Sequence, residues 1–401
     1  MINDLEFNQD YTSLMVATPT GYTIYTTDPF GEYYSSFKSA RRKSVVSSDS
    51  APDDVDMDAS ECPTKFLKML LSTSLTIIVP ENEPRQVEIH NLKQHVKVCT
   101  LRFSEDIVGV KLNKKRLVVA TTSTLSIYDL SQVKSVGTIA AKSGPYDLAR
   151  DDKTLAFAVE NIDKNSPIWE SEFPVYHPDG KSLTPHQLRK KTGYVVLYDT
   201  IDSRPLFAFK AHDSTIGHIT VYGTSSSPKL SIATASTKGT VVRVFTWESG
   251  AITSVQAFRR GHNPTAIASL VFDQEAEVLG CASENTVHLF DLLDGNQVSK
   301  PDDNEDELND NLANLLVAKE GKKRSVMSGI MKKLPYKDFL EPKRAFAYVR
   351  LAGTHARVEL GFSQQHHLYV ASYDQAKLFD YKLPERGESR QECHLVLEYD
   401  L

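Results

Sequence analysis

Two adjacent arginines, Arg259 and Arg260, stand in the tetrapeptide Phe258-Arg-Arg-Gly261. A guanidinium group presents a planar fork of donors to phosphate oxygens, so the pair suggests recognition of phosphate groups. Because successive side chains of an extended chain point to opposite faces, we expect the two arginines to serve two different pockets. Taken alone, such a pair is more often a solvated basic turn, and it is the repeats on either side that favour phosphate recognition here.

Two similar segments, Leu230–Phe245 and Val278–Phe290, flank the arginines and supply further donors. Hydroxyls donate without adding charge, and a histidine gains a donor as the pH falls toward its usual pKa. The first pocket is therefore predicted to contain His212, Ser236, Thr240 and Arg259, and the second to contain Arg260, Ser283, Thr286 and His288. If both histidines contact phosphate, binding should tighten between about pH 7.5 and 6. The alternative is that the serines bond to backbone and that the histidines are ordinary strand residues.

A recurring pattern must position these side chains: an apolar strand, a turn, a strand ending in Ala-Ser or Ala-Thr, a short turn, and a strand ending near Phe/Tyr-Asp. Short β-branched runs with a period of about 40 residues indicate an all-β propeller. We expect one domain over residues 1–401, a seven-bladed β-propeller of WD40-like repeats, with the strand near Thr12–Ala17 pairing beside the C-terminal strands to close the ring. The copies are Thr12–Thr26, Lys68–Leu92, Val108–Leu130, a split copy over Tyr146–Thr200, His218–Phe245, Ile267–Leu292 and Val358–Tyr381.

Three segments interrupt the pattern, at about 38–60, 161–191 and 293–342. In the last segment, apolar residues fall at one-turn spacing beside lysines, which predicts a basic amphipathic helix that contacts a membrane surface. The residues concerned are Met327, Ile330, Met331, Leu334, Lys332 and Lys333. The alternative is a charged loop that touches nothing.

Composition limits the function classes. The 401 residues carry a net charge of −6, so bulk electrostatics do not favour nucleic acid. The four cysteines lack metal-site spacing, so we expect no metal and no cofactor. No secretory signal and no run of 18 apolar residues is evident, so membrane contact should be peripheral. No catalytic motif appears, and we expect no enzyme.

The Phe258-Arg-Arg-Gly261 motif between two such repeats resembles the PROPPIN family, β-propellers that bind polyphosphoinositides. Asn8–Ser13, Leu71–Leu75, Lys111–Val119 and Ala235–Phe245 match the family as well. The resemblance implies a seven-bladed propeller with two headgroup pockets for phosphatidylinositol 3-phosphate or the 3,5-bisphosphate, made by the eight pocket residues named above. It also implies that the third insertion enters the membrane.

The resemblance further implies a partner, an acidic coiled-coil protein of the autophagy conjugation machinery, held by basic residues between the second and third blades. Arg116 is the first choice and Arg102 the second. The chain resembles fungal members, and among them the one that promotes lipidation of a ubiquitin-like protein. We expect a cytoplasmic monomer that docks on preautophagosomal, endosomal and vacuolar membranes. The competing hypothesis is a scaffold that binds only proteins, with a structural arginine pair.

Overall fold

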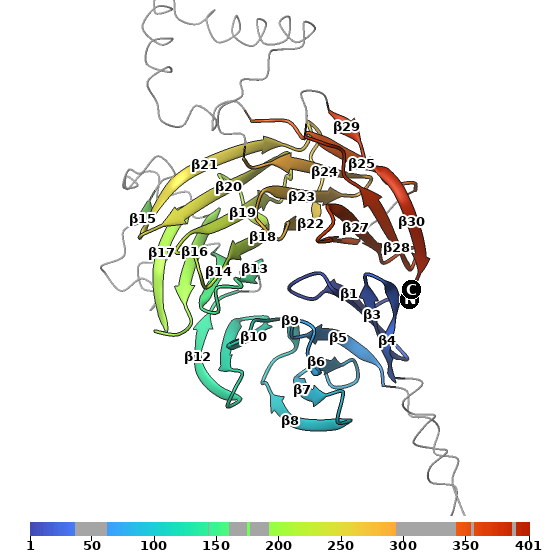
Figure 1. The fold of residues 1–401 in the computed structure, drawn as a ribbon. Coiled ribbons are helices and arrows are strands. Elements are labelled where there is room, and N and C mark those ends of the chain that lie inside the picture. The colour runs from blue at the N-terminus through green and yellow to red at the C-terminus, as the bar shows by residue number, and fades with distance from the viewer. Residues whose placement is uncertain are drawn as a thin grey trace, which may run out of the picture.

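Seven β-sheets form a closed ring in the computed structural model, which describes residues 1–36, 62–142, 144–159, 175–176, 192–293, 342–353, 357–386 and 390–401 (Figure 1). Each sheet is one blade of a propeller, built mainly from antiparallel neighbours in chain order. The predicted all-β, seven-bladed fold is confirmed.

The first three blades use consecutive strands. Blade 1 contains β1 (Asp4–Phe7), β2 (Ser13–Thr18), β3 (Gly21–Thr27) and β4 (Phe30–Ser35). Blade 2 contains β5 (Thr64–Met69), β6 (Leu75–Pro80), β7 (Gln86–Asn91) and β8 (Val96–Arg102). Blade 3 contains β9 (Ile107–Leu112), β10 (Arg116–Thr121), β11 (Thr124–Asp129) and β12 (Lys134–Ala140).

The next two blades lie on either side of the first predicted pocket. Blade 4 contains β13 (Tyr146–Leu148), β14 (Thr154–Val159), β16 (Tyr194–Asp199) and β17 (Arg204–Lys210). A short parallel strand from the second insertion, β15 (Val175–Tyr176), extends blade 4 beside β17. Blade 5 contains β18 (Ile216–Gly223), β19 (Leu230–Ser236), β20 (Val241–Glu248) and β21 (Ala251–Arg259).

The last two blades share the C-terminal segment. Blade 6 contains β22 (Ile267–Phe272), β23 (Val278–Ser283), β24 (Thr286–Asp291) and β25 (Ala347–Arg350). A fifth strand, β29 (Gln391–Glu392), joins blade 6 in parallel beside β25. Blade 7 contains β26 (Val358–Phe362), β27 (His367–Ser372), β28 (Lys377–Lys382) and β30 (His394–Asp400).

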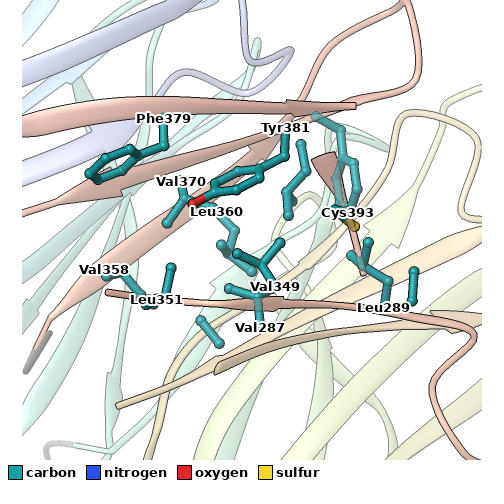
Figure 2. Close-up of a cluster of buried hydrophobic side chains, with 14 of the residues drawn as sticks. Val287, Leu289, Val349, Leu351, Val358, Leu360, Val370, Phe379, Tyr381 and Cys393 are labelled. Carbon is teal, nitrogen blue, oxygen red and sulfur yellow. The ribbon is translucent and has the colours of Figure 1, made fainter. Parts of the chain in front are cut away.

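Apolar side chains between neighbouring blades form the core. Alternation along each strand sends successive side chains into the two interfaces on either side of a blade. Between blades 6 and 7, Val287, Leu289 and Val349 pack with Leu360 and Val370, all of them nearly inaccessible to solvent (Figure 2). Each fully buried aliphatic side chain of this kind stabilises the fold by about 1.5–3 kcal/mol.

The ring closes through side-chain packing. The N-terminal strands form a complete blade of their own, and blade 7 takes all four strands from the C-terminal part of the chain. The prediction that the segment near Thr12–Ala17 pairs beside the C-terminal strands is therefore wrong. Leu5 and Leu14 of blade 1 instead pack with Leu378 of blade 7, and the rings of Phe30 and Tyr399 stack at 4.2 Å.

Most of the three predicted insertions lies outside the described residues. The exceptions are β15 and the two ends of the third insertion, Leu293 and Pro342. The predicted membrane-contacting residues Met327, Ile330, Met331, Leu334, Lys332 and Lys333 all belong to the part that is not described. Within the described ranges, no helix is long and apolar enough to cross a bilayer.

Candidate anion pockets on either side of blade 5

Arg259 is the last residue of β21, and the register shows which face of blade 5 it occupies. It lies opposite Val241 on β20, and Val241 shares its face with Phe245 because the two are four residues apart. Phe245 packs on Phe209 of blade 4, with ring centroids 4.7 Å apart. Arg259 therefore lies on the face of blade 5 that is turned toward blade 4. Its guanidinium Nη1 is 3.4 Å from Nδ1 of His262 in the following turn.

Arg260 lies on the other side of blade 5, toward blade 6. Its Nε donates to the carbonyl of Gly239 at 2.9 Å, and its Nη2 donates to the carbonyl of Asn263 at 2.6 Å. Burial lowers the pKa of Arg260, whose charge in turn acts to lower the pKa of Cys281 and of His288 on blade 6. Two consecutive arginines are thus directed to two different inter-blade spaces.

The space between blades 4 and 5 holds His212, which follows β17. Its Nε2 is 2.9 Å from Thr234 Oγ1, and its Nδ1 is 3.4 Å from Nη1 of Arg243, which also donates to the carbonyl of Ala211 at 2.6 Å. Ser236 is buried at the end of β19, and Thr240, partly buried, stands in the turn before β20.

Sequence reasoning missed Arg243 as a member of this first pocket. The signal was present, because Val241-Val-Arg-Val-Phe245 alternates and so puts Arg243 on the same face as Phe245, toward blade 4.

The second pocket, between blades 5 and 6, contains a continuous row of polar atoms. Ser283 Oγ and Thr286 Oγ1 are 3.1 Å apart, and Thr286 Oγ1 is 3.3 Å from His288 Nε2. The other nitrogen of His288, Nδ1, is 3.1 Å from Nη2 of Arg390. Arg390 was not anticipated, since it comes from the C-terminal segment and carries no local motif.

Both pocket histidines are buried, with exposed fractions of 5% for His212 and 7% for His288. Burial and the charge of Arg243 lower the pKa of His212 to about 3. Burial and the charges of Arg390 and Arg260 lower the pKa of His288 to about 4. Both imidazoles are therefore neutral above pH 6, which removes the basis for binding that tightens between pH 7.5 and 6. We now expect anion binding to stay level over that range.

Three of the pocket arginines stand apart from the carboxylates of the described residues. Within the described part of the chain, Arg259, Arg260 and Arg390 form no ion pair with a carboxylate, and no group of three acidic, histidine or cysteine side chains is placed to hold a metal ion. Uncompensated guanidinium groups beside hydroxyl donors suit a phosphate monoester, which accepts several charge-assisted hydrogen bonds.

Both ends of the third insertion are attached to β21. The carbonyl of Leu292, just before the insertion, accepts a hydrogen bond from Gln256 Nε2 at 3.2 Å. Lys343, just after it, donates its N–H to the carbonyl of Ala257 at 2.8 Å and accepts from the N–H of Arg259 at 2.7 Å. The strand that ends in the arginine pair therefore also holds both ends of this insertion.

Comparison with known proteins shows the family of the chain. A family model described as PROPPIN matches residues 2–150 and 165–401. The chain belongs to the PROPPIN family. Autophagy-related protein 21 of Candida albicans is 34% identical over 100% of this chain and 99% of its own length. Autophagy-related protein 21 of Debaryomyces hansenii is 32% identical over 100% of this chain and 99% of its own length.

Solved structures agree on the fold of this PROPPIN. The complex of KlAtg21 with the coiled coil of AgAtg16 has a TM-score of 0.65 at 21% identity, covering 99% of this chain and 98% of that one. Kluyveromyces lactis Hsv2p has a TM-score of 0.64 at 17% identity, covering 100% of this chain and 98% of that one. The relatives are propeller proteins of autophagy, and theirs is not a known enzyme family.

The two residues predicted to contact a protein partner of this PROPPIN differ in their exposure to solvent. Arg116 is only 6% exposed, because its Nη1 bonds to Asp129 Oδ2 at 2.6 Å and its Nε donates to the carbonyl of Thr200 at 3.1 Å. This guanidinium joins blades 3 and 4, and the role of Arg116 as the first partner contact stays a prediction. Arg102, at the end of β8, is exposed.

Proposed function

We propose that this PROPPIN is a phosphoinositide effector that docks peripherally on membranes and recruits autophagy machinery. Its ligands are phosphatidylinositol 3-phosphate and the 3,5-bisphosphate, one headgroup in each pocket. The observation that carries the proposal is the division of Arg259 and Arg260 between the two faces of blade 5, toward two inter-blade spaces that each hold a buried histidine and a buried serine. Among the described residues, neither arginine pairs with a carboxylate.

Two pockets strengthen docking through multivalency. His212 follows the outer strand β17, and the arginine pair ends the outer strand β21 of the next blade, so both pockets open at the same side of the ring. A membrane carrying several headgroups can fill both at once, which raises the apparent affinity by about 10²–10⁴ over one site. Local geometry can then outweigh the net charge of −6.

The third insertion adds a proposed membrane contact through Met327, Ile330, Met331 and Leu334, with Lys332 and Lys333 beside them. Its ends are attached to β21, so the insertion starts and finishes next to the pockets. An amphipathic segment held there would reach the same bilayer that offers the headgroups.

A coiled-coil partner completes the proposal. KlAtg21 has been solved with the coiled coil of AgAtg16. We assign the equivalent contact here to the exposed surface around Arg102, between blades 2 and 3, which suits an acidic helix. The protein would act as a cytoplasmic monomer recruited to preautophagosomal, endosomal and vacuolar membranes.

Vesicle co-sedimentation tests this function. The wild type should bind vesicles with phosphatidylinositol 3-phosphate or the 3,5-bisphosphate and ignore phosphatidylserine vesicles of equal charge. Replacing both Arg259 and Arg260 by Thr should abolish binding while leaving the melting temperature within a few degrees, since neither arginine makes a buried ion pair with a described residue. Unchanged binding by the double variant would favour the protein-only scaffold.

A further inference from the structure

Two arginines lie over one tyrosine at the outer edge of blade 6, and a third arginine is close to them. The guanidinium carbons of Arg390 and Arg350 lie 4.5 and 5.4 Å from the ring centroid of Tyr348, and Arg344 is close enough to act on Arg390 electrostatically. We call these four residues the blade 6 arginine cluster. All three arginines are exposed, and Arg350 and Arg390 are the two whose donors the argument uses. Partial burial and the positive charges of Arg344 and Arg350 lower the pKa of Arg390.

This cluster is continuous with the second pocket. Arg390 Nη2 lies 3.1 Å from His288 Nδ1. On the β24–β25 ladder, Thr286 lies opposite Arg350 and His288 lies opposite Tyr348, so all four side chains share one face of the blade. A ligand that occupies the pocket beside Thr286 therefore has the arginine cluster directly next to it.

In the first pocket, the corresponding strand pair has the same register but carries no such group of arginines around a tyrosine. On β20 and β21, Arg243 lies opposite Ala257, and Val241 lies opposite Arg259. Phe245 of blade 5 and Phe290 of blade 6 each pack on a phenylalanine of the preceding blade, so the two are equivalent positions. Counting back two residues from each makes Arg243 equivalent to His288.

By this alignment Arg259 takes the place of Arg350, whereas the buried Ala257 stands where blade 6 has Tyr348. In the part of the chain that the structure describes, blade 5 has four strands and no fifth one that could supply a residue like Arg390. The second pocket therefore has an aromatic ring and the guanidinium of Arg390 that the first lacks, whereas the first has Arg243 where the second has His288.

The segment that follows Arg390 holds this arginine in place. β29 follows directly and pairs with β25, with Gln391 donating to the carbonyl of Phe346 at 3.0 Å. Cys393 donates to the carbonyl of Tyr348 at 2.8 Å and is buried in the cluster between blades 6 and 7 (Figure 2). The hydroxyl of Tyr348 donates to Glu392 at 3.4 Å, which helps to orient the ring.

We infer that the blade 6 arginine cluster is a subsite for a second phosphate group, so that the second pocket binds a bisphosphorylated inositol headgroup more tightly than a monophosphorylated one, whereas the first pocket binds the two alike. The inference rests on the proposed phosphoinositide function and adds to it a difference between the pockets. A second phosphate placed against Arg390 and Arg350 would relieve the repulsion among the cations and gain charge-assisted hydrogen bonds.

Arg390→Gln tests the subsite in the full-length protein. It should weaken binding to vesicles with phosphatidylinositol 3,5-bisphosphate by about tenfold, the loss of one charge-assisted contact at an exposed site. Binding to vesicles with phosphatidylinositol 3-phosphate should change less than twofold. The matched control is Arg386→Gln, an arginine of the same segment that pairs with Glu277 at 2.9 Å and should alter neither affinity.

Calorimetry with soluble inositol 1,3,5-trisphosphate separates the headgroup from the bilayer. A similar tenfold loss in Arg390→Gln supports a direct phosphate contact. A loss confined to vesicles, an equal loss for both lipids, or no loss overturns the subsite. If the subsite fails while the Arg259→Thr, Arg260→Thr variant still loses all binding, the proposed function stands without it. If that double variant binds normally, the proposed function itself has failed.

Discussion

At the scale of single residues, alternation along β21 and the turn after it explains the use of two consecutive arginines. Each guanidinium reaches a different inter-blade space, which no pair separated by two residues would do within one strand. This could be predicted from the tetrapeptide together with the two similar segments that flank it. The burial of His212 and His288 could not, because it depends on how closely neighbouring blades pack around them and on arginines that arrive from other strands.

The different burial of Arg116 and Arg102 could not be predicted from the sequence either, and it leads to a prediction. Arg116→Ala should lower the free energy of unfolding by about 2–3 kcal/mol, because it leaves Asp129 and the carbonyl of Thr200 without their partner. Arg102→Ala should change it by less than about 0.5 kcal/mol and should instead weaken binding of an acidic coiled coil. Urea denaturation and a pull-down measure the two effects. Wild-type stability of Arg116→Ala together with lost partner binding would support Arg116 as a contact residue.

At the scale of strands, β21 combines three tasks: it ends in the arginine pair, faces both pockets and holds both ends of the third insertion. The recurring strand pattern was enough to predict seven blades, because the sequence contains seven copies of it and each copy has its own turn residues. Ring closure was mispredicted because a four-strand pattern does not show whether the first strand starts a new blade or completes the last. Arg390 was missed because β29 has only two residues and no alternation to detect.

At the scale of the whole molecule, the innermost strands of all seven blades surround a central cavity of about 180 Å³. Charged side chains from different blades meet there, among them Glu6, Lys68, Lys111 and Asp147. Burial and the nearby charge of Glu6 raise the pKa of Glu359, on β26, to about 8, so this carboxyl is protonated at neutral pH.

Glu359 therefore links the stability of the ring to pH. The native state retains a proton that the unfolded chain releases near its ordinary pKa of 4.5, so stability is highest below that value and falls as the pH rises toward 8. Glu359→Gln cannot ionise, and should gain roughly 1–3 kcal/mol over the wild type between pH 5 and 8. Urea denaturation at several pH values measures this. The exposed carboxylate variant Glu398→Gln is the control, and parallel curves for wild type and Glu359→Gln would refute the link.

The most direct test of the two-pocket account is the binding stoichiometry of a short-chain, soluble phosphatidylinositol 3-phosphate, measured by calorimetry without a bilayer. We predict two sites for the wild type, and one site each for Arg259→Thr and Arg260→Thr, because each substitution empties one side of blade 5 and leaves the other intact. A single site in the wild type, or loss of both sites in either single variant, would contradict the division of the arginine pair between two pockets.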